Sequence, residues 1–223
     1  MTNVFISALL AGLCLASAAS ASASSFTAQV NDKEGKPLAD AVVTLKGPPD
    51  PSPVALKASM DQRDQEFAPH VLAIHTGTQV KFPNSDNIRH QVYSFSPAKR
   101  FELRLYEGTP SDPLLFDKPG VVVLGCNIHD WMVGYIYVTD DSWFGVTDSN
   151  GQLKLDQLPA GHYNATLWHP QIADMQPVAG GEFEVPAAGL TRRFNLAVEM
   201  QAEDKPGKPA PGGFGDAFHK ATH

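Results

Sequence analysis

Turn-forming residues recur at short intervals along this chain and leave room for little except short strands. Of its 223 residues, 18 are glycine and 18 are proline. Helix start and stop signals are weak throughout. Between the turns lie short alternating or β-branched runs, among them 41-AVVTL-45, 71-VLAI-74, 121-VVVLGC-126 and 134-GYIYV-138. Many short strands at this spacing are typical of β-sandwiches, so the sequence predicts an all-β fold.

The strand-rich part of the chain divides into three stretches. Residues 26–48 hold two alternating segments around a turn at 32–37, and we expect them to form a hairpin that joins a larger sheet. Residues 50–142 form a continuous strand-rich region. Residues 143–200 continue with strands separated by Asn-Gly and Pro-Ala-Gly turns.

Both ends of the chain differ from this pattern. Residues 1–23 combine an apolar run with small residues, as in a cleavable secretory signal peptide, and an uncleaved anchor is the alternative. Cleavage near Ala23 leaves 223 − 23 = 200 residues, none of them in a segment apolar enough to span a membrane. Residues 201–223 are Gly- and Pro-rich and are expected to be a disordered, solvated tail, although His219 and His223 lie in it. We therefore expect a periplasmic or secreted protein.

Charge and cysteine content narrow the function. The net charge of −7, without runs of Lys or Arg, argues against binding to nucleic acid or anionic lipid. The chain has two cysteines, and Cys14 leaves with the signal peptide. Cys126 then has no intramolecular disulfide partner. In an oxidising compartment such a thiol pairs between chains, binds a metal or is buried and inert.

The residues after Cys126 favour the metal. His129 and Met132 follow at positions +3 and +6. With eight histidines and five methionines in 223 residues, this placement has a chance of roughly one in a thousand. Zinc sites use Cys and His but not thioether sulfur. Copper accepts thiolate, imidazole and thioether together, and a trigonal site of two His and one Cys with a weak axial Met carries single electrons.

The required second histidine has a candidate upstream. In 79-QVKFPNSDNIRHQVYSF-95, a strand, a turn through Asn84 and Asp86, and then His90 follow one another. Together with the Cys-x2-His-x2-Met loop, this order resembles the cupredoxin family, and the tight loop is most similar to that of amicyanin. The resemblance covers about residues 61–139. It implies a Greek-key sandwich, with one copper ion held by His90, Cys126 and His129 as equatorial ligands and by Met132 as axial ligand. Asn84 would brace the ligand loop by hydrogen bonds.

The same resemblance indicates where partners would dock. The C-terminal ligand histidine of cupredoxins reaches the surface through an apolar patch, to which Ile128 and Trp131 would belong here. Trp131 could instead pack against the sandwich. Asp130 departs from amicyanin, which has proline at that place. The other histidines of the strand-rich regions match no ligand position and are interpreted as structural or exposed: His70, His75, His162 and His169.

The flanking segments resemble a second family. The pattern Gly-x-Pro-Leu-x-x-Ala-x-Val-x-Leu at 35–45, with Thr-Asp-x-x-Gly at 147–151 and Leu-Pro-x-Gly-x-Tyr at 158–163, is similar to carboxypeptidase-regulatory-like, transthyretin-like β-sandwiches. The resemblance implies a discontinuous domain of residues 26–48 and 143–200, interrupted by a cupredoxin domain of residues 50–142. Such insertion is plausible because domain termini often lie close together. A single enlarged sandwich is the alternative.

The functional hypothesis is a mononuclear type 1 copper protein that carries single electrons between unidentified redox protein partners. The whole arrangement resembles exported proteins described as methylamine-utilization or plastocyanin-like. We expect no enzymatic activity, because no second histidine cluster is organised to form a substrate-activating site. The alternatives are a copper-binding or copper-delivery protein, and a structural docking module without a redox role.

Overall fold

The protein is built from β-strands. The computed structural model describes residues 23–50, 56–110 and 112–198, and every regular element in these ranges is a strand, so the all-β prediction is confirmed. The strands are β1 (Ala23–Asn31), β2 (Val42–Lys46), β3 (Lys57–Ser59), β4 (Asp61–Arg63), β5 (Glu66–Ala68), β6 (Val71–His75), β7 (Thr78–Lys81), β8 (His90–Ser94), β9 (Phe101–Tyr106), β10 (Leu114–Phe116), β11 (Gly120–Gly125), β12 (Val133–Thr139), β13 (Trp143–Val146), β14 (Gln152–Pro159), β15 (Gly161–Trp168), β16 (Val178–Val185) and β17 (Leu190–Asn195).

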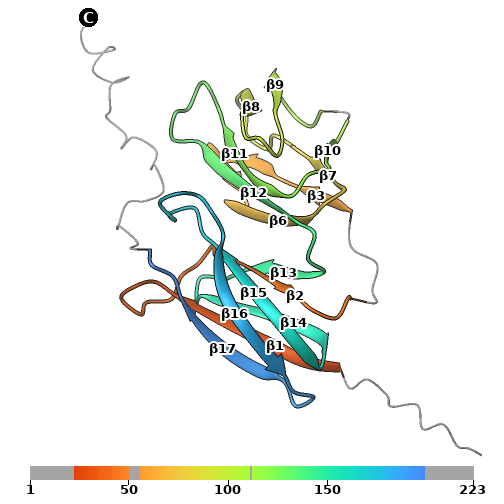
Figure 1. Ribbon diagram of the computed structural model, residues 1–223. Coiled ribbons are helices and arrows are strands. Elements are labelled where there is room, and N and C mark those ends of the chain that lie inside the picture. The colour runs from red at the N-terminus through yellow and green to blue at the C-terminus, as the bar shows by residue number, and fades with distance from the viewer. Residues whose placement is uncertain (1–22, 51–55, 111, 199–223) are drawn as a thin grey trace, which may run out of the picture.

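The strands fall into two groups, stacked one above the other in Figure 1. The middle unit, β3–β12, has a five-stranded sheet in the order β6-β12-β11-β8-β9, a three-stranded sheet β10-β7-β3 and the β4-β5 hairpin. Its core lies between the sheets and is contributed by alternate strand residues, such as Val80, Val92, Leu124 and Ile136. In the large sheet β12 runs antiparallel to β11 and parallel to β6.

The flanking unit, β1, β2 and β13–β17, is a second sandwich. Its sheets have the orders β14-β1-β17 and β13-β2-β15-β16. Phe26 and Val30 of β1 and Leu45 of β2 are fully buried in the core between these sheets. Within the described residues, the chain thus starts and finishes in one sandwich and builds the other in between. That the two units form independent domains stays a prediction.

The hairpin predicted across residues 32–37 is confined to the turn itself and does not extend to the two strands beside it. Strand β1 belongs to one sheet of the flanking unit and β2 to the other, and the two do not pair. Antiparallel contacts stay at the turn: Asn31 and Pro37 form an isolated bridge, the Asp32 amide donates to the Lys36 oxygen and the Leu38 amide donates to the Val30 oxygen, both at 2.9 Å. After this turn, residues 38–41 carry the chain from one sheet to the facing one. The physical reason is that both strands bury apolar side chains in the same core. They face each other across it and cannot pair edge to edge.

A third apolar cluster joins the two units. Trp168, at the end of β15, is fully buried and packs against Tyr135 and Tyr137 of β12, with ring centroids 5.6 and 5.7 Å apart. Val42 of β2 and Val71 of β6 complete the buried part of this cluster. The indole Nε1–H donates to the backbone oxygen of Met175 at 3.1 Å. Side chains from both units therefore form a third buried cluster, separate from the core of either unit.

Two predicted segments lie outside the described residues. These are the signal peptide at 1–23, apart from its last residue, and the tail at 201–223 with His219 and His223. Within the described ranges, no helix is long and apolar enough to cross a membrane.

His169 follows Trp168 and is buried, with 3% of its surface exposed. Its ring forms hydrogen bonds through Nε2 with the Ala39 oxygen and through Nδ1 with the Gln171 amide, which donates. A ring that donates from Nε2 and accepts at Nδ1 is neutral. Burial lowers the pKa of His169 to about 4; the Ala39 hydrogen bond and Asp40 partly oppose this, and His70 adds to it.

This neutral histidine predicts a loss of stability in acid. A histidine in the unfolded chain has a pKa of about 6.5. Between that value and about 4 the unfolded state binds one more proton, so stability falls as pH falls through this window. The full loss is about 3 kcal/mol. Urea unfolding of metal-free protein at pH 7 and pH 4 should show a component of this size that is absent in His169→Asn. Equal pH dependence in both proteins would contradict the prediction.

Candidate metal centre

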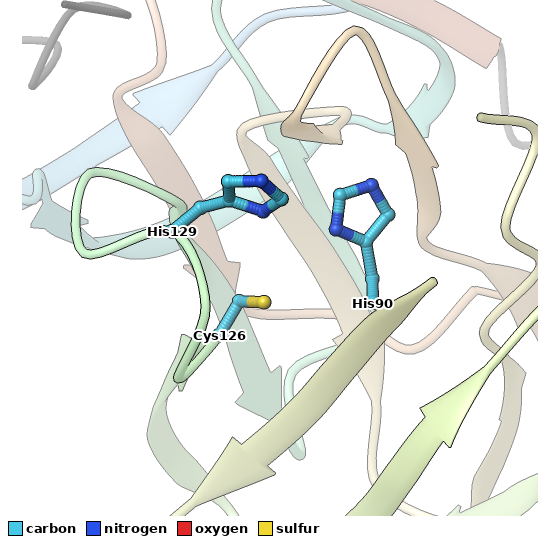
Figure 2. A group of neighbouring side chains, drawn as sticks. All are labelled: His90, Cys126 and His129. Atoms are coloured by element: carbon cyan, nitrogen blue, oxygen red, sulfur yellow. The ribbon is translucent and has the colours of Figure 1, made fainter. Parts of the chain in front are cut away.

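Three side chains from separate places in the middle unit meet at one point. His90 is the first residue of β8, Cys126 follows the last residue of β11, and His129 lies in the loop before β12. One donor atom from each lies within 4.8 Å of the others. Figure 2 shows the two rings and the sulfur directed toward a common centre. The ring centroids of His90 and His129 are 4.9 Å apart.

The strand ends explain this convergence. Strands β8 and β11 are antiparallel neighbours, with Gly125 opposite Tyr93, so His90 at the start of β8 lies beside the loop that follows β11. Glycine at position 125 leaves room for Tyr93, because a Cβ there would lie 2.7 Å from the Tyr93 ring and hydroxyl. The following loop turns tightly, and the Met132 amide donates to the His129 oxygen at 2.9 Å. This turn brings His129 back over Cys126.

The site is mostly closed to solvent. His90 is fully buried, and Cys126 and Met132 are 2% and 1% exposed. Met132 packs in the same core cluster as Cys126. His129 is half-buried, so the centre approaches the surface on its side. Sulfur and nitrogen donors gathered at a mostly buried point suit a metal ion, because bare polar atoms would otherwise lie in an apolar core.

The residues fit a metal ion in one further respect. The Nδ1 atom of His90 is buried and has no hydrogen-bond partner in the described part of the chain. In Figure 2 this nitrogen faces Cys126 and His129. A lone pair buried without a donor is unfavourable unless something binds it. Within the described ranges, these three residues are the single group of His, Cys, Asp and Glu side chains that could hold a metal.

Asn84 holds the turn that leads into His90. Its side-chain Nδ2 donates to the backbone oxygens of Ile88 and Tyr106 at 2.8 and 2.9 Å, and its Oδ1 accepts from the Asp86 amide at 3.1 Å. These bonds tie the turn to β9, the neighbour of β8. The side chain is buried, with 5% of its surface exposed.

The two residues of the expected docking patch differ in position. Ile128 is exposed over 48% of its surface. Trp131 is half-buried, and its ring lies 5.1 Å from that of His129. Its Nε1 atom is buried and forms no hydrogen bond with another described residue. The Trp131 ring therefore lies beside the His129 ring. Ile128, which precedes His129 in the chain, is the exposed apolar residue on this side of the site.

The remaining described histidines lie apart from this group. His70 and His75 are half-buried, His162 is exposed, and His169 is buried in the flanking unit. His70 stacks edge-on to Tyr135, and His75 forms a hydrogen bond with the Thr76 oxygen.

Asp86 is the residue that the sequence interpretation missed. One carboxylate oxygen lies 2.6 Å from His90 Nε2. Burial alone raises the pKa of Asp86, but the hydrogen bonds from the Gln65 amide, His90 and the Asp64 amide outweigh it, so this pKa is below its usual value. The spacing of Asp86 and His90 was visible in the sequence. Because the intervening residues form a turn and not a helix, that spacing alone gave no reason to expect contact.

Comparisons with known proteins give partial likenesses to solved structures. No family model matches the chain, and no curated protein matches it. The copper-containing nitrite reductase of Thermus scotoductus SA-01 is 28% identical over 38% of this chain, with a TM-score of 0.35, and this chain spans 22% of its length. A purple cupredoxin from Nitrosopumilus maritimus is 23% identical over 37% of this chain and 99% of its own, with a TM-score of 0.33. An amicyanin variant in its oxidised form is 17% identical over 43% of this chain and 99% of its own, with a TM-score of 0.34. Because each covers less than half of this chain, the metal assignment below rests on the donor set.

Proposed function

We propose that this protein is a mononuclear type 1 copper protein that carries single electrons between redox protein partners. The observation that carries the proposal is the convergence of the His90, Cys126 and His129 donor atoms within 4.8 Å of one another at a mostly buried point. One thiolate and two imidazoles are the equatorial set of blue-copper sites. Met132, buried in the same cluster as Cys126, is the proposed weak axial ligand.

The donor set itself disfavours the other common metals. Hard cations such as Mg²⁺ and Ca²⁺ take oxygen ligands. Zinc accepts Cys and His but leaves Met132 without a role. Copper uses all four residues. When bound, it would supply a one-electron couple, and the buried residues around it would hold one geometry in both oxidation states. We propose a carrier and not an enzyme, because these four residues would leave no position for a substrate.

Electrons would enter and leave beside His129. It is the half-buried ligand, and Trp131 and the exposed Ile128 adjoin it. Electron-transfer complexes are small and transient, so a few apolar residues beside the ligand are enough for such a contact. We propose that donor and acceptor proteins contact this side, and that the protein works in the periplasm or outside the cell. The cupredoxin character of the middle unit and the transthyretin-like character of the flanking unit are part of the same proposal.

Titration of the purified, reduced protein with Cu(II) tests the proposal. We expect one equivalent to bind and to produce intense visible absorption, because charge transfer from thiolate to Cu(II) is strong in such sites. Ascorbate should remove the colour and ferricyanide should restore it over repeated cycles. A colourless complex would contradict the proposal. Coloured protein with slow electron self-exchange would favour copper delivery over electron transfer.

A further inference from the structure

We propose that Asp86 is a positioning residue of the metal centre. It holds the His90 ring with Nδ1 toward the metal and favours the oxidised over the reduced ion. The inference rests on the proposed function and concerns the same site. It starts from the hydrogen bond of 2.6 Å between His90 Nε2 and Asp86 Oδ2. His90 is fully buried and the Asp86 side chain is 13% exposed, so water competes little for this bond.

The bond decides which ring nitrogen can bind the metal. An ionised carboxylate only accepts hydrogen bonds, so Nε2 must carry the hydrogen. A neutral imidazole then has its lone pair on Nδ1. This is the buried atom of His90 that has no hydrogen-bond partner in the described ranges and faces Cys126 and His129 in Figure 2. Asp86 thus fixes both the tautomer and the orientation of the ring.

Asp86 is itself held by an unusual turn. The β4-β5 hairpin closes through Asp64 and Gln65, whose φ angles of 56° and 61° lie in the left-handed region. Two-residue hairpin turns of this type favour glycine or asparagine, and Gln65 occupies a position where glycine is preferred. The backbone amides of both residues donate to the Asp86 carboxylate, at 2.7 and 2.9 Å. The two left-handed residues therefore direct their N–H groups at the carboxylate that holds His90.

Further bonds keep the hairpin and the turn before His90 together. The Ser85 hydroxyl donates to Asp61 at 2.8 Å, and the Ser85 amide donates to the Gln62 oxygen at 2.9 Å. The Gln62 amide in turn donates to the Pro83 oxygen at 3.0 Å. The position of Asp86, and through it that of His90, is set by the hairpin tip as well as by β8.

The carboxylate also affects the metal's charge preference. A negative group hydrogen-bonded to a ligand imidazole makes the ring a stronger electron donor, which stabilises the more highly charged ion. Loss of such an outer partner lowers metal affinity about 10- to 100-fold in characterised sites. Removal of Asp86 should weaken the binding of Cu(II) more than the binding of Cu(I). If the two affinities fall by factors that differ tenfold, the reduction potential of the one-electron couple rises by about 59 mV.

The test compares Asp86→Asn with Glu107→Gln. Glu107 follows Tyr106, which pairs with His90 across β8 and β9, and its carboxylate is exposed and contacts Arg89 at 3.1 Å. Both substitutions remove one negative charge near the site, but only the first removes the partner of His90. Circular dichroism checks that both variants fold, and Asp86→Glu, which retains the charge, should recover part of the effect.

Two readouts are needed. In metal-free protein, ¹⁵N NMR of the imidazoles should show His90 as the Nε2–H tautomer in wild type and Glu107→Gln, and as a mixture in Asp86→Asn. In copper-loaded protein, Asp86→Asn should bind Cu(II) about 10- to 100-fold more weakly and have a higher reduction potential. If Asp86→Asn matches Glu107→Gln in either readout, the role of Asp86 is overturned. A wild-type protein that binds no copper would overturn the proposed function instead. The NMR experiment on metal-free protein would still test whether Asp86 fixes the tautomer of His90.

Discussion

Replacing Cys126 by serine is expected to abolish the intense visible absorption of the copper-loaded protein. The thiolate is the donor that gives this absorption, and a serine hydroxyl is neither soft nor ionised at neutral pH. The affinity for Cu(II) should fall by more than the roughly 10- to 100-fold that loss of an outer hydrogen-bond partner causes. Absorption spectra and competition titrations with a chelator of known affinity measure both effects.

Met132→Leu provides the matched control for Cys126→Ser. Both residues are buried in the same cluster, and leucine fills nearly the volume of methionine. If Met132 is the weak axial ligand, this variant should keep its strong colour and change its reduction potential, because the axial ligand tunes the potential. Unchanged colour in Cys126→Ser, or complete loss of colour in Met132→Leu, would contradict the assigned roles.

The second large effect is expected at Trp168. Truncation to alanine would leave a cavity where the flanking unit meets Tyr135 and Tyr137 of the middle unit. Loss of a buried tryptophan lowers the free energy of unfolding by about 3–5 kcal/mol. Urea unfolding of metal-free protein measures the loss, since bound metal would add its own stabilisation.

Trp168→Phe separates packing from hydrogen bonding at this position. Phenylalanine retains most of the aromatic contact but leaves the Met175 oxygen without the indole donor. A loss of about 1–2 kcal/mol in the free energy of unfolding is expected from this change.

Because each unit also has a core of its own, the two units of Trp168→Ala should unfold in separate transitions. Fluorescence from Trp131 and from Trp143, measured in single-tryptophan versions of Trp168→Phe and Trp168→Ala, reports on each unit. A Trp168→Ala protein within 1 kcal/mol of wild type would show that the shared cluster contributes little.

Local patterns in the sequence predicted the strands well. The runs at 71–74, 121–126 and 134–138 lie within or overlap β6, β11 and β12, because alternation and turn chemistry are properties of neighbouring residues. For the same reason, the hairpin at residues 32–37 was expected to include the strands on both sides of the turn, which lie in different sheets. A short turn between two alternating segments looks the same whether the segments pair or face each other across a core. Only the distant partners of β1 and β2 distinguish the two cases.

The sequence by itself determined the all-β class, and through its resemblance to cupredoxins it named His90, Cys126, His129 and Met132 as candidate ligands. Donor chemistry is a property of individual side chains, and three of these four lie in one short loop. The tertiary structure alone decided that His90 lies beside that loop, because the pairing of β8 with β11 sets this proximity. It also decided that Asp86 and the tip of a separate hairpin hold His90. These contacts join groups that are brought together only by the fold, so the periodicity of the sequence does not predict them.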